Sequence, residues 1–335
     1  MTLDTTPRAA AGLLVRRLLK RNFRVVVAFM AMFILIALNA ALNPRFFTLP
    51  VLTSTSNQAM TLVFAGMAQT SVVITGGIDL SVGPIISLTN SVASALFTAS
   101  VPGAIGVVIL VLLVGALCGL INGLIVVYGR LQPIIVTLAT SSIYAGIALY
   151  LRPSPGGFVP DWYGSLLTSR IFGLVPASLI LLMLVIVIVW TPFRRSRMGL
   201  WVYATGGNEA AAYLSGINVN RAKLAAYTMG GLLAAIAGLF LTAQTQSGNA
   251  NTGTVFTLQS IAVVVLGGTS LFGGSGGVTG TIAGGFTLRL ISGVLFFANI
   301  NPLQQPLWEG AVMLLAVIAG ASRVFTVKNR LDIFR

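Results

Sequence analysis

Long apolar stretches separated by short polar ones extend along nearly the whole chain. A helix needs about 20 mostly apolar residues to cross a bilayer, and several of the stretches reach that length. We expect ten membrane spans, at residues 25–42, 57–75, 81–99, 104–128, 134–151, 171–190, 224–246, 258–266, 278–298 and 308–322. The pattern predicts an all-α fold, a polytopic transmembrane helical bundle of about ten spans.

The composition excludes a soluble protein. Of the 335 residues, 56% are hydrophobic and only 8% are charged, whereas roughly a quarter of the residues of a soluble domain are charged. So few charged side chains could not cover the surface of a soluble protein of this length. We therefore expect a multi-pass membrane protein whose main surroundings are membrane lipid.

The basic residues predict how the chain is oriented. Cations flank the cytoplasmic ends of membrane helices, and this threading puts sixteen of the 20 Lys and Arg side chains on one side. The exceptions are Arg45, Arg152 and Arg170 on the other side and Arg289 within a span. Both termini are then cytoplasmic. The expected parts are a basic N-terminus at 1–24, a transmembrane domain at 25–322 and a basic tail at 323–335.

The net charge of +14 does not indicate a nucleic-acid partner. Nucleic-acid-binding proteins gather their cations on one basic face, often with aromatic residues between them. Here the cations lie at span ends instead. We therefore expect no nucleic-acid partner.

Catalytic chemistry has few candidate residues in this chain. There is no histidine, six acids are present, and the one cysteine, Cys118, lies within an apolar span. Histidine is the commonest general base and a common metal ligand, so a metal centre or a hydrolytic triad is not expected. The chain also lacks a Gly-Lys-Ser or Gly-Lys-Thr sequence and so has no phosphate-binding loop. If ATP drives this protein, another subunit must bind it.

Two polar intervals interrupt the spans. Residues 152–170 contain prolines, glycines and the pair Trp162-Tyr163, and we expect an outer loop anchored at the membrane interface or presenting a docking surface. Residues 193–223 form a cytoplasmic loop in which Gly206-Gly207-Asn208 predicts a turn. Asn208 can then cap a short helix, Glu209 falls in its first turn, and Gly216 can end it. That helix either docks a partner or only shapes the loop.

A third interruption is Gly76-Gly77-Ile78-Asp79-Leu80-Ser81-Val82-Gly83. Two consecutive glycines disfavour a continuous helix, and Asp79 is the only acid between Asp4 and Asp161. Asp79 either lines a solute route or gate through a broken helix, or caps the helix that follows. Both interpretations stay open on the sequence alone.

Amide side chains within the spans are the other candidates for a solute passage, because amides both donate and accept hydrogen bonds. The candidates are Gln58, Asn90, Asn122 and Gln244. Amides in membrane helices also hold neighbouring helices together, so this alternative stays open as well. The stripe Gly115, Gly119 and Gly123 lies at helical spacing and predicts close packing against another helix.

Three segments carry a resemblance to a known family. They are Gly76–Gly83, which matches the family sequence GGIDLSVG over all eight residues, Gly206–Ile217 and Gly267–Gly274. With these segments the chain resembles, over nearly its full length, the permease subunit of ribose-type ABC sugar importers. The resemblance implies a bacterial inner-membrane protein that translocates a monosaccharide. It also implies three partners, namely an ABC ATPase subunit, a periplasmic sugar-binding protein and a second permease chain, identical or different.

The resemblance also implies a role for the loop helix. In the family a helix at this place sits in a groove of the ATPase subunit and transmits ATP-driven closure to the membrane helices. The residues that match are Gly206, Gly207, Asn208, Glu209, Ala210, Ala211, Leu214 and Gly216. ATP and Mg²⁺ would then be bound by the partner, and this chain would carry no cofactor and no catalytic residue.

Alternatives to sugar import remain. The cargo of the same machinery could be an amino acid, a nucleoside or a signalling furanose. An ion-coupled secondary transporter would instead need an ion site, which Asp79 could supply.

An internal similarity relates two of the family-like segments. Val72–Leu80 resembles Val263–Leu271, and transporters are often built from internal repeats with broken helices at matching places. The expected topology puts both copies on the same side of the membrane, which an inverted repeat would not do. Either the repeat is not inverted, or one span boundary is misplaced.

Overall fold

The computed structural model describes residues 23–321. The predicted basic tail at 323–335, and the predicted basic N-terminus at 1–24 except for its last two residues, lie outside the described residues.

Helices dominate the described residues, and one short hairpin accompanies them. The helices are α2 (Phe23–Leu42), α3 (Leu49–Val73), α4 (Val82–Leu96), α5 (Val101–Tyr128), α6 (Pro133–Leu151), α7 (Asp161–Thr168), α8 (Ala177–Leu184), α9 (Thr191–Arg195), α10 (Arg197–Gly207), α11 (Glu209–Leu214), α12 (Val219–Thr245), α13 (Val255–Leu266), α14 (Val278–Phe297) and α15 (Gln305–Ala321). A π-helical turn, Val185–Trp190, joins α8 to α9, and 3-10 turns are present at Thr252–Thr254 and Pro302–Gln304. The hairpin pairs β1 (Arg170–Ile171) with β2 (Val175–Pro176) in antiparallel register. The predicted all-α membrane bundle is thus confirmed.

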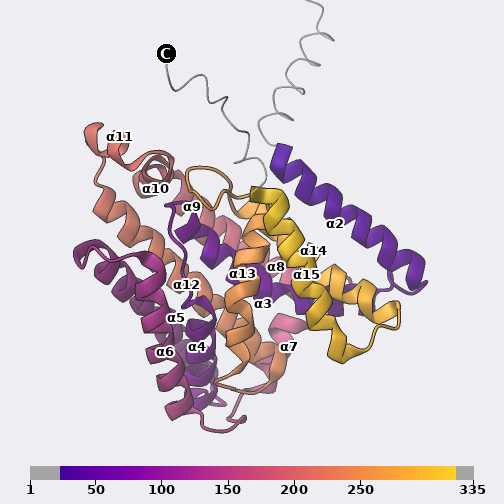
Figure 1. The fold of residues 1–335 in the computed structure, drawn as a ribbon. Helices are drawn as coiled ribbons and strands as arrows, with labels where there is room; N and C mark the ends of the chain where they lie inside the picture. The colour runs from indigo at the N-terminus through magenta and orange to yellow at the C-terminus, as the bar shows by residue number, and fades with distance from the viewer. Residues whose placement is uncertain (1–22, 322–335) are drawn as a thin grey trace, which may run out of the picture.

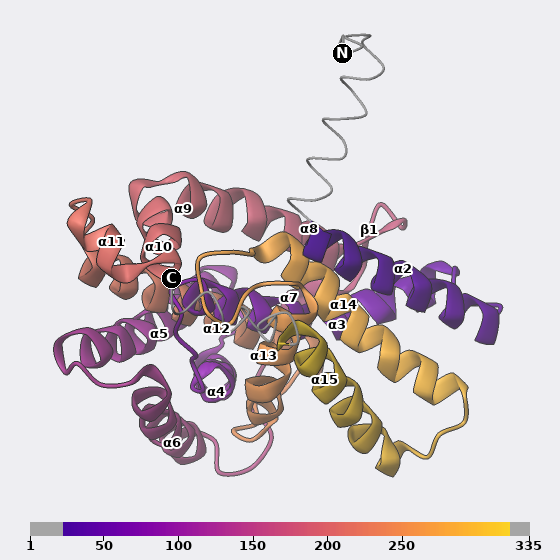
Figure 2. The ribbon, with the colours of Figure 1, turned by 45° about the horizontal axis from the view of Figure 1, so that its top comes forward.

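Two helices, α3 and α12, form the centre of the bundle. α12 packs against α5, α3 and α4, and α3 also packs against α13 and α14. Phe64 of α3 and Phe240 of α12 are fully buried and meet edge to face, with ring centroids 6.2 Å apart. α6 and α2 lie on opposite sides of this centre, as both views of the ribbon show (Figures 1 and 2).

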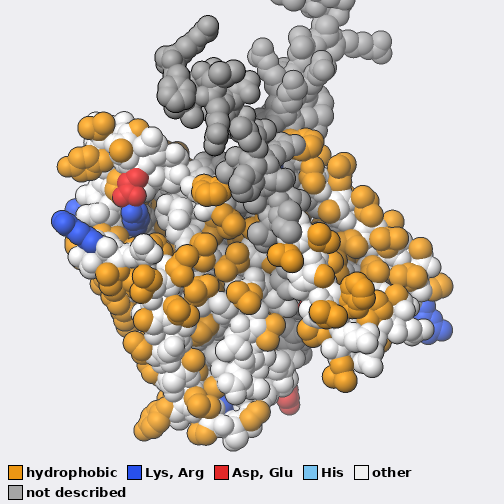
Figure 3. Space-filling model, in the orientation of Figure 1, with side chains coloured by type: hydrophobic (Ala, Val, Ile, Leu, Met, Phe, Trp, Pro, Cys, Tyr) orange, Lys and Arg blue, Asp and Glu red, His pale blue; other side chains and the backbone are white. Residues whose placement is uncertain are grey.

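Six helical segments are long and apolar enough to cross a membrane. They are Phe23–Leu42, Val101–Tyr128, Pro133–Leu151, Ala177–Arg195, Val219–Thr245 and Val278–Phe297. Two shorter apolar helical segments, Val82–Leu96 and Thr252–Leu266, accompany them. The outer helices expose large apolar side chains, such as Leu113 on α5 and Ile188 in the π-helical turn, and apolar atoms spread over the face drawn in Figure 3. Such a surface suits lipid and not water.

The polar interval at 152–170 is more structured than expected. It contains the helix α7, and the buried Tyr163 donates its hydroxyl to the carbonyl oxygen of Leu239 at a distance of 3.2 Å. The expectation that Tyr163 anchors the chain at the membrane interface was therefore wrong, because the side chain packs against α12.

The predicted span at 171–190 was misplaced at both ends. Phe172 and Gly173 adopt positive φ angles in the turn of the hairpin, so the helix begins only at Ala177. It then continues through the π-helical turn to Arg195.

The glycine stripe of α5 packs against α12, as predicted. A Cβ atom on Gly119 would lie 2.1 Å from the carbonyl oxygen of Tyr227, and one on Gly231 would lie 2.1 Å from the carbonyl oxygen of Gly115. Two helix backbones can approach this closely only where side chains are absent. By contrast, Gly106 on the same helix has open space where a Cβ would stand.

This contact predicts a position-specific loss of stability. Gly119→Ala forces a methyl group against the α12 backbone, and overpacking of this kind costs about 1–3 kcal/mol. Thermal unfolding of the purified protein in detergent should show a midpoint several degrees lower for Gly119→Ala. The matched variant Gly106→Ala should keep or slightly raise the midpoint, because alanine favours helix over glycine. Equal midpoints for the two variants would contradict the packing described.

Candidate functional site

The short helix α11 forms as the sequence predicts. Asn208 has an extended backbone, and its side-chain oxygen accepts a hydrogen bond from the Ala211 N–H at 3.0 Å. Glu209 occupies the first turn, where the positive end of the helix dipole favours an acid. Gly216 ends the turn with a φ of 78°, a value that glycine adopts without strain. Gly206 and Gly207 do not form a separate turn but are the last two residues of α10.

α11 projects from the bundle and exposes apolar side chains. It lies at the upper left of Figure 1, and only Ala212 in it is buried. Tyr213 and Leu214 are 73% and 85% exposed. Neighbouring exposed apolar side chains on a projecting helix are typical of a surface that a partner protein covers.

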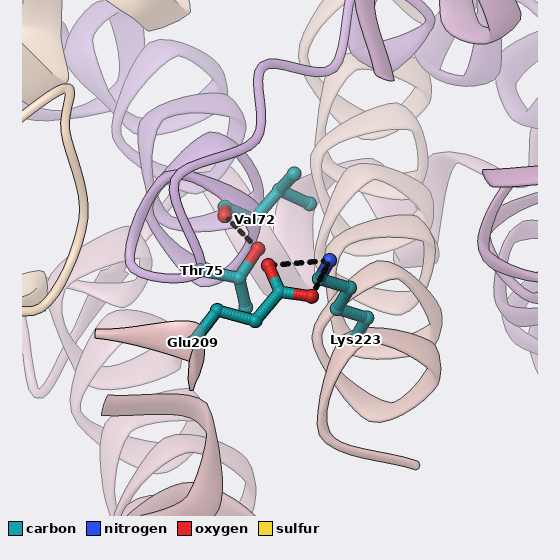
Figure 4. A network of polar contacts seen from close by, with 4 residues as sticks. All are labelled: Val72, Thr75, Glu209 and Lys223. Carbon is teal, nitrogen blue, oxygen red and sulfur yellow. Dashed lines mark hydrogen bonds and ion pairs between the residues drawn. The ribbon is translucent and has the colours of Figure 1, made fainter. Parts of the chain in front are cut away.

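An ion pair holds α11 to the start of α12. The Lys223 ammonium donates to both carboxylate oxygens of Glu209, at 2.8 and 2.9 Å. Because the Glu209 side chain is 58% exposed, the pair contributes at most about 1 kcal/mol, and its main effect is to fix the direction of the carboxylate. Figure 4 shows Thr75, at the end of α3, lying beside this pair, and the Thr75 hydroxyl donates to the Val72 carbonyl oxygen at 2.7 Å.

The three family-like segments meet at a contact between glycine backbones, which we call the glycine junction: Ile74–Gly77, Gly206-Gly207 and Gly273-Gly274. The Gly274 N–H donates to the Ile74 carbonyl oxygen at 2.9 Å. A Cβ on Gly206 would lie 1.7 Å from that same oxygen and 2.6 Å from the Gly274 nitrogen. The end of α10 is thereby pressed against the end of α3 with no side chain between them.

The junction also decides how the two similar segments are placed. Val72–Leu80 contains Ile74 and Gly76-Gly77, and Val263–Leu271 is followed, after Phe272, by Gly273-Gly274. Since Ile74 and Gly76 lie against Gly273-Gly274, both copies reach the same side of the bundle, as the expected topology requires. This placement favours the first of the two alternatives, a repeat that is not inverted.

A tyrosine joins α10 to the same glycine-rich loop. The Tyr203 hydroxyl donates to the Gly276 carbonyl oxygen at 3.1 Å, and the Arg194 guanidinium lies 5.9 Å from the centre of the Tyr203 ring. Burial raises the pKa of Tyr203, and the nearby Arg194 offsets part of that rise. The hydroxyl therefore stays protonated and remains a donor.

Asp79 is completely buried in the turn between α3 and α4. One carboxylate oxygen accepts from the Ser81 N–H at 2.8 Å and from the Ser81 hydroxyl at 2.6 Å, and the other has no partner among the described residues. With its amide oriented to satisfy both atoms, Gln69 of α3 donates to the Asp79 carbonyl at 2.8 Å and accepts from its N–H at 3.2 Å. Asp79 thus holds the turn that precedes α4.

Asn122 and Asn90 also lie in buried networks between helices. The Asn122 amide donates to the Ser81 hydroxyl at 2.7 Å, and the Asn122 oxygen accepts from the Tyr144 hydroxyl at 3.1 Å. The Asn90 amide donates to the Thr242 hydroxyl at 2.7 Å, and its oxygen accepts from the Asn249 N–H at 2.7 Å. Neither side chain lines the cavity that contains Gln58 and Gln244.

Gln58 and Gln244, by contrast, line one cavity of about 780 Å³. Its lining residues are Pro50, Thr53, Ser54, Asn57, Gln58, Thr168, Ser169, Arg170, Gly173 and Gln244. Hydroxyl and amide groups dominate, Arg170 is the one charged side chain in that list, and no carboxylate is in it. The Gln58 oxygen also accepts a hydrogen bond from Arg289 of α14. The cavity can therefore offer hydrogen-bond donors and acceptors to a neutral, hydroxyl-rich solute.

Sequence reasoning missed several residues of these sites. Asn57 and Arg170 line the cavity, and Asn57 donates to the Thr168 carbonyl oxygen at 2.7 Å. The sequence shows Arg289 as a cation within a span, and such a cation needs a polar partner on a neighbouring helix. Gln58 is that partner, and the sequence alone did not identify it. The contacts of the glycine junction carry no signal in the sequence beyond the glycines themselves.

Comparison with known proteins identifies the family. Residues 51–320 match the family model described as branched-chain amino acid transport system / permease component. The ribose import permease protein RbsC of Haemophilus influenzae is 35% identical over 87% of this chain and 91% of its own length. RbsC of Escherichia coli K12 is 37% identical over 86% and 91%. The autoinducer 2 import system permease protein LsrD of Escherichia coli HS is 30% identical over 83% and 86%.

No solved structure matches the chain. The match to the family model covers most of the sequence, and the relatives are permease proteins of import systems over most of their own length. The chain therefore belongs to the permease family described as branched-chain amino acid transport system / permease component.

Proposed function

We propose that this chain is the membrane-spanning permease subunit of an ATP-driven importer of a monosaccharide in a bacterial inner membrane. The proposed partners are an ABC ATPase subunit, a periplasmic sugar-binding protein and a second permease chain. The glycine junction carries the mechanical part of the proposal, because it links the central helix α3 to the end of α10, and one residue later the exposed helix α11 begins. The similarity to two ribose import permeases supports the choice of cargo.

The proposed topology has ten spans with both termini in the cytoplasm. The six long apolar segments supply part of this count, and α3, α4, α13 and α15 supply the rest. α4 and α13 are short, with 15 and 12 residues. α4 begins after the turn that contains Gly76-Gly77, and α13 ends in the glycine-rich turn that starts at Gly267. Irregular backbone at membrane depth is tolerated where it is buried in protein or lines a cavity. The loop that carries α11 then faces the cytoplasm, and the cavity lined by Gln58 and Gln244 faces outward.

In the proposed mechanism α11 is the coupling helix. The exposed tip, Tyr213 and Leu214, enters a groove of the ATPase subunit. The proposed coupling residues are Asn208, Glu209, Ala210, Ala211, Leu214 and Gly216, which contact the ATPase, and Gly206 and Gly207, which belong to the glycine junction. When ATP closes the ATPase dimer, α11 moves and the glycine junction passes the displacement to the end of α3. The passage then changes its access from one side to the other.

The outer cavity is the proposed entry of the passage. Gln58 and Gln244 present amides to the solute hydroxyls as the binding protein releases it. Asp79, Asn90 and Asn122 do not contact the solute in this proposal but hold the helices around its path. An ion-coupled mechanism is disfavoured, because Asp79 is enclosed by its own turn and no second acid accompanies it among its hydrogen-bond partners.

A furanose other than ribose is the second candidate cargo. The similarity to an autoinducer 2 import permease supports it. The cavity cannot distinguish the two, since amide and hydroxyl groups suit any polyhydroxylated ring.

The cargo and energy source are tested together by reconstitution. Proteoliposomes containing this chain, its ATPase and the binding protein should take up labelled ribose when ATP is enclosed with the ATPase. A protonophore should leave that uptake unchanged, because no ion gradient drives it. Uptake that survives removal of ATP and collapses with the protonophore would overturn the proposal.

Reversing the charge of Glu209 should uncouple the ATPase. Glu209→Arg places a cation beside Lys223 and against the proposed ATPase groove, and we expect the stimulation of ATP hydrolysis by loaded binding protein to fall at least about tenfold, a loss of roughly 1.4 kcal/mol of coupling. Stimulation equal to that of the unaltered protein in Glu209→Arg would refute the docking role.

Crowding the glycine junction should block transport without releasing the ATPase. In Gly206→Ala the added methyl group overlaps the Ile74 carbonyl, so α10 must shift away from α3. We expect the ATPase to copurify normally while uptake drops several-fold. Gly207→Ala adds the same methyl group into open space and should reduce uptake much less. If both variants transport equally well, the junction does not carry the motion.

A further inference from the structure

A second cavity, of about 740 Å³, lies where α9 and α10 approach the start of α14. Ile186 and Trp190 of the π-helical turn, Arg194 and Arg195 of α9, Leu200 of α10 and Ile282 of α14 line it. It is separate from the cavity that holds Gln58 and Gln244, and the two share no lining residue.

The cavity changes character along the helix axis. Ile186 and Arg194 are eight residues apart, which corresponds to about 12 Å of helix. The arginines stand at the end that leads into α10 and α11, and Ile186 and Ile282 lie deeper in the bundle. The same helix exposes Val187 and Ile188 outward, at a depth where its surroundings are apolar. The cavity is therefore charged at the membrane surface and apolar inside the membrane.

The helix is irregular where it borders the cavity. Thr191 donates its N–H to the carbonyl of Ile186, five residues earlier, and Pro192 has no N–H to give. The resulting π-helical turn widens the helix, and such turns frequently occur at functional sites.

The two arginines have no carboxylate partner in the part of the chain that the structure describes. The ion pair found there joins Lys223 to Glu209, and no Asp or Glu is among the lining residues of the cavity. Arg194 rests on the Tyr203 ring, and both arginines are exposed. Thr279 adds a hydroxyl, and the first turn of α14, which has no side-chain cap, adds backbone N–H groups. All of these groups attract an anion.

We propose that this cavity binds an anionic phospholipid of the inner leaflet. Its phosphate lies between Arg194 and Arg195, and an acyl chain runs along Ile186 and Ile282. A soluble phosphate would use the arginines but leave the apolar depth empty, and an ATPase subunit could not reach that depth. The proposal rests on the proposed membrane orientation and is independent of which solute is carried.

Lipid retention tests the site. The permease–ATPase complex is purified from nanodiscs of phosphatidylcholine with phosphatidylglycerol as the minor component, and the bound lipid is counted by native mass spectrometry. Each arginine near a membrane surface contributes about 1 kcal/mol to anionic lipid binding, which is roughly a fivefold change in affinity. The double variant Arg194→Gln/Arg195→Gln should therefore lower the amount of retained phosphatidylglycerol about 25-fold. Arg221→Gln, an exposed arginine outside the cavity, should not change it.

A second variant keeps the test independent of charge. Ile282→Trp fills the apolar part of the cavity and leaves both arginines in place. It should also displace phosphatidylglycerol, while the amount of phosphatidylcholine bound elsewhere on the protein should not change. Equal retention in all variants would overturn the proposal. So would displacement of the lipid by soluble glycerol phosphate, which would indicate a site for free phosphate. Loss of the ATPase with normal lipid retention would assign the arginines to the subunit interface instead. None of these outcomes depends on sugar uptake.

Discussion

A single backbone hydrogen bond, from the Gly274 N–H to the Ile74 carbonyl oxygen, marks the place on which the rest of the structure depends. Gly206 closes over this bond so tightly that no Cβ atom fits. Three stretches far apart in the sequence therefore meet through backbone atoms alone. A contact of this kind has no side-chain rotamers to absorb a displacement, so a shift of α10 must move α3, break the bond or separate the segments.

The contact matters because α3 occupies the centre of the bundle. α3 is buried along most of its length and packs against α12, α13 and α14. Its N-terminal half carries Gln58, which lines the 780 Å³ cavity and accepts a hydrogen bond from Arg289. One helix thus joins the glycine junction at one end to polar groups around a cavity at the other. The buried networks of Asp79, Asn90 and Asn122 stiffen its neighbours, since fully buried polar groups are costly to separate from their partners.

The sequence predicts the class of the protein and the local shape of α11 well, and for clear reasons. Apolar length and cation placement are set by the membrane, and the cap at Asn208 and the stop at Gly216 are local chemistry that needs no knowledge of the fold. The hairpin before α8 was missed, because the sequence of a short apolar hairpin resembles the start of a membrane span. The burial of Tyr163 was missed, because a tyrosine is equally common at a membrane interface and in a protein core. For the passage, residue type alone could not separate Gln58 and Gln244, which line the cavity, from Asn90 and Asn122, which join helices. That distinction depends on which helices are neighbours, and the sequence alone does not determine it.

The central claim is that ATP-driven motion reaches the outer end of α3 through the glycine junction. Spin labels at Leu49, the first residue of α3, and Tyr150, near the end of α6, would report it in the complete importer; both positions are exposed, and Cys118, the one cysteine of the chain, would be replaced by alanine. A double electron–electron resonance experiment should show the Leu49–Tyr150 distance distribution shifting when ATP closes the ATPase dimer. A distribution that stays the same with and without ATP, in a complex that hydrolyses ATP and transports its solute, would contradict the account.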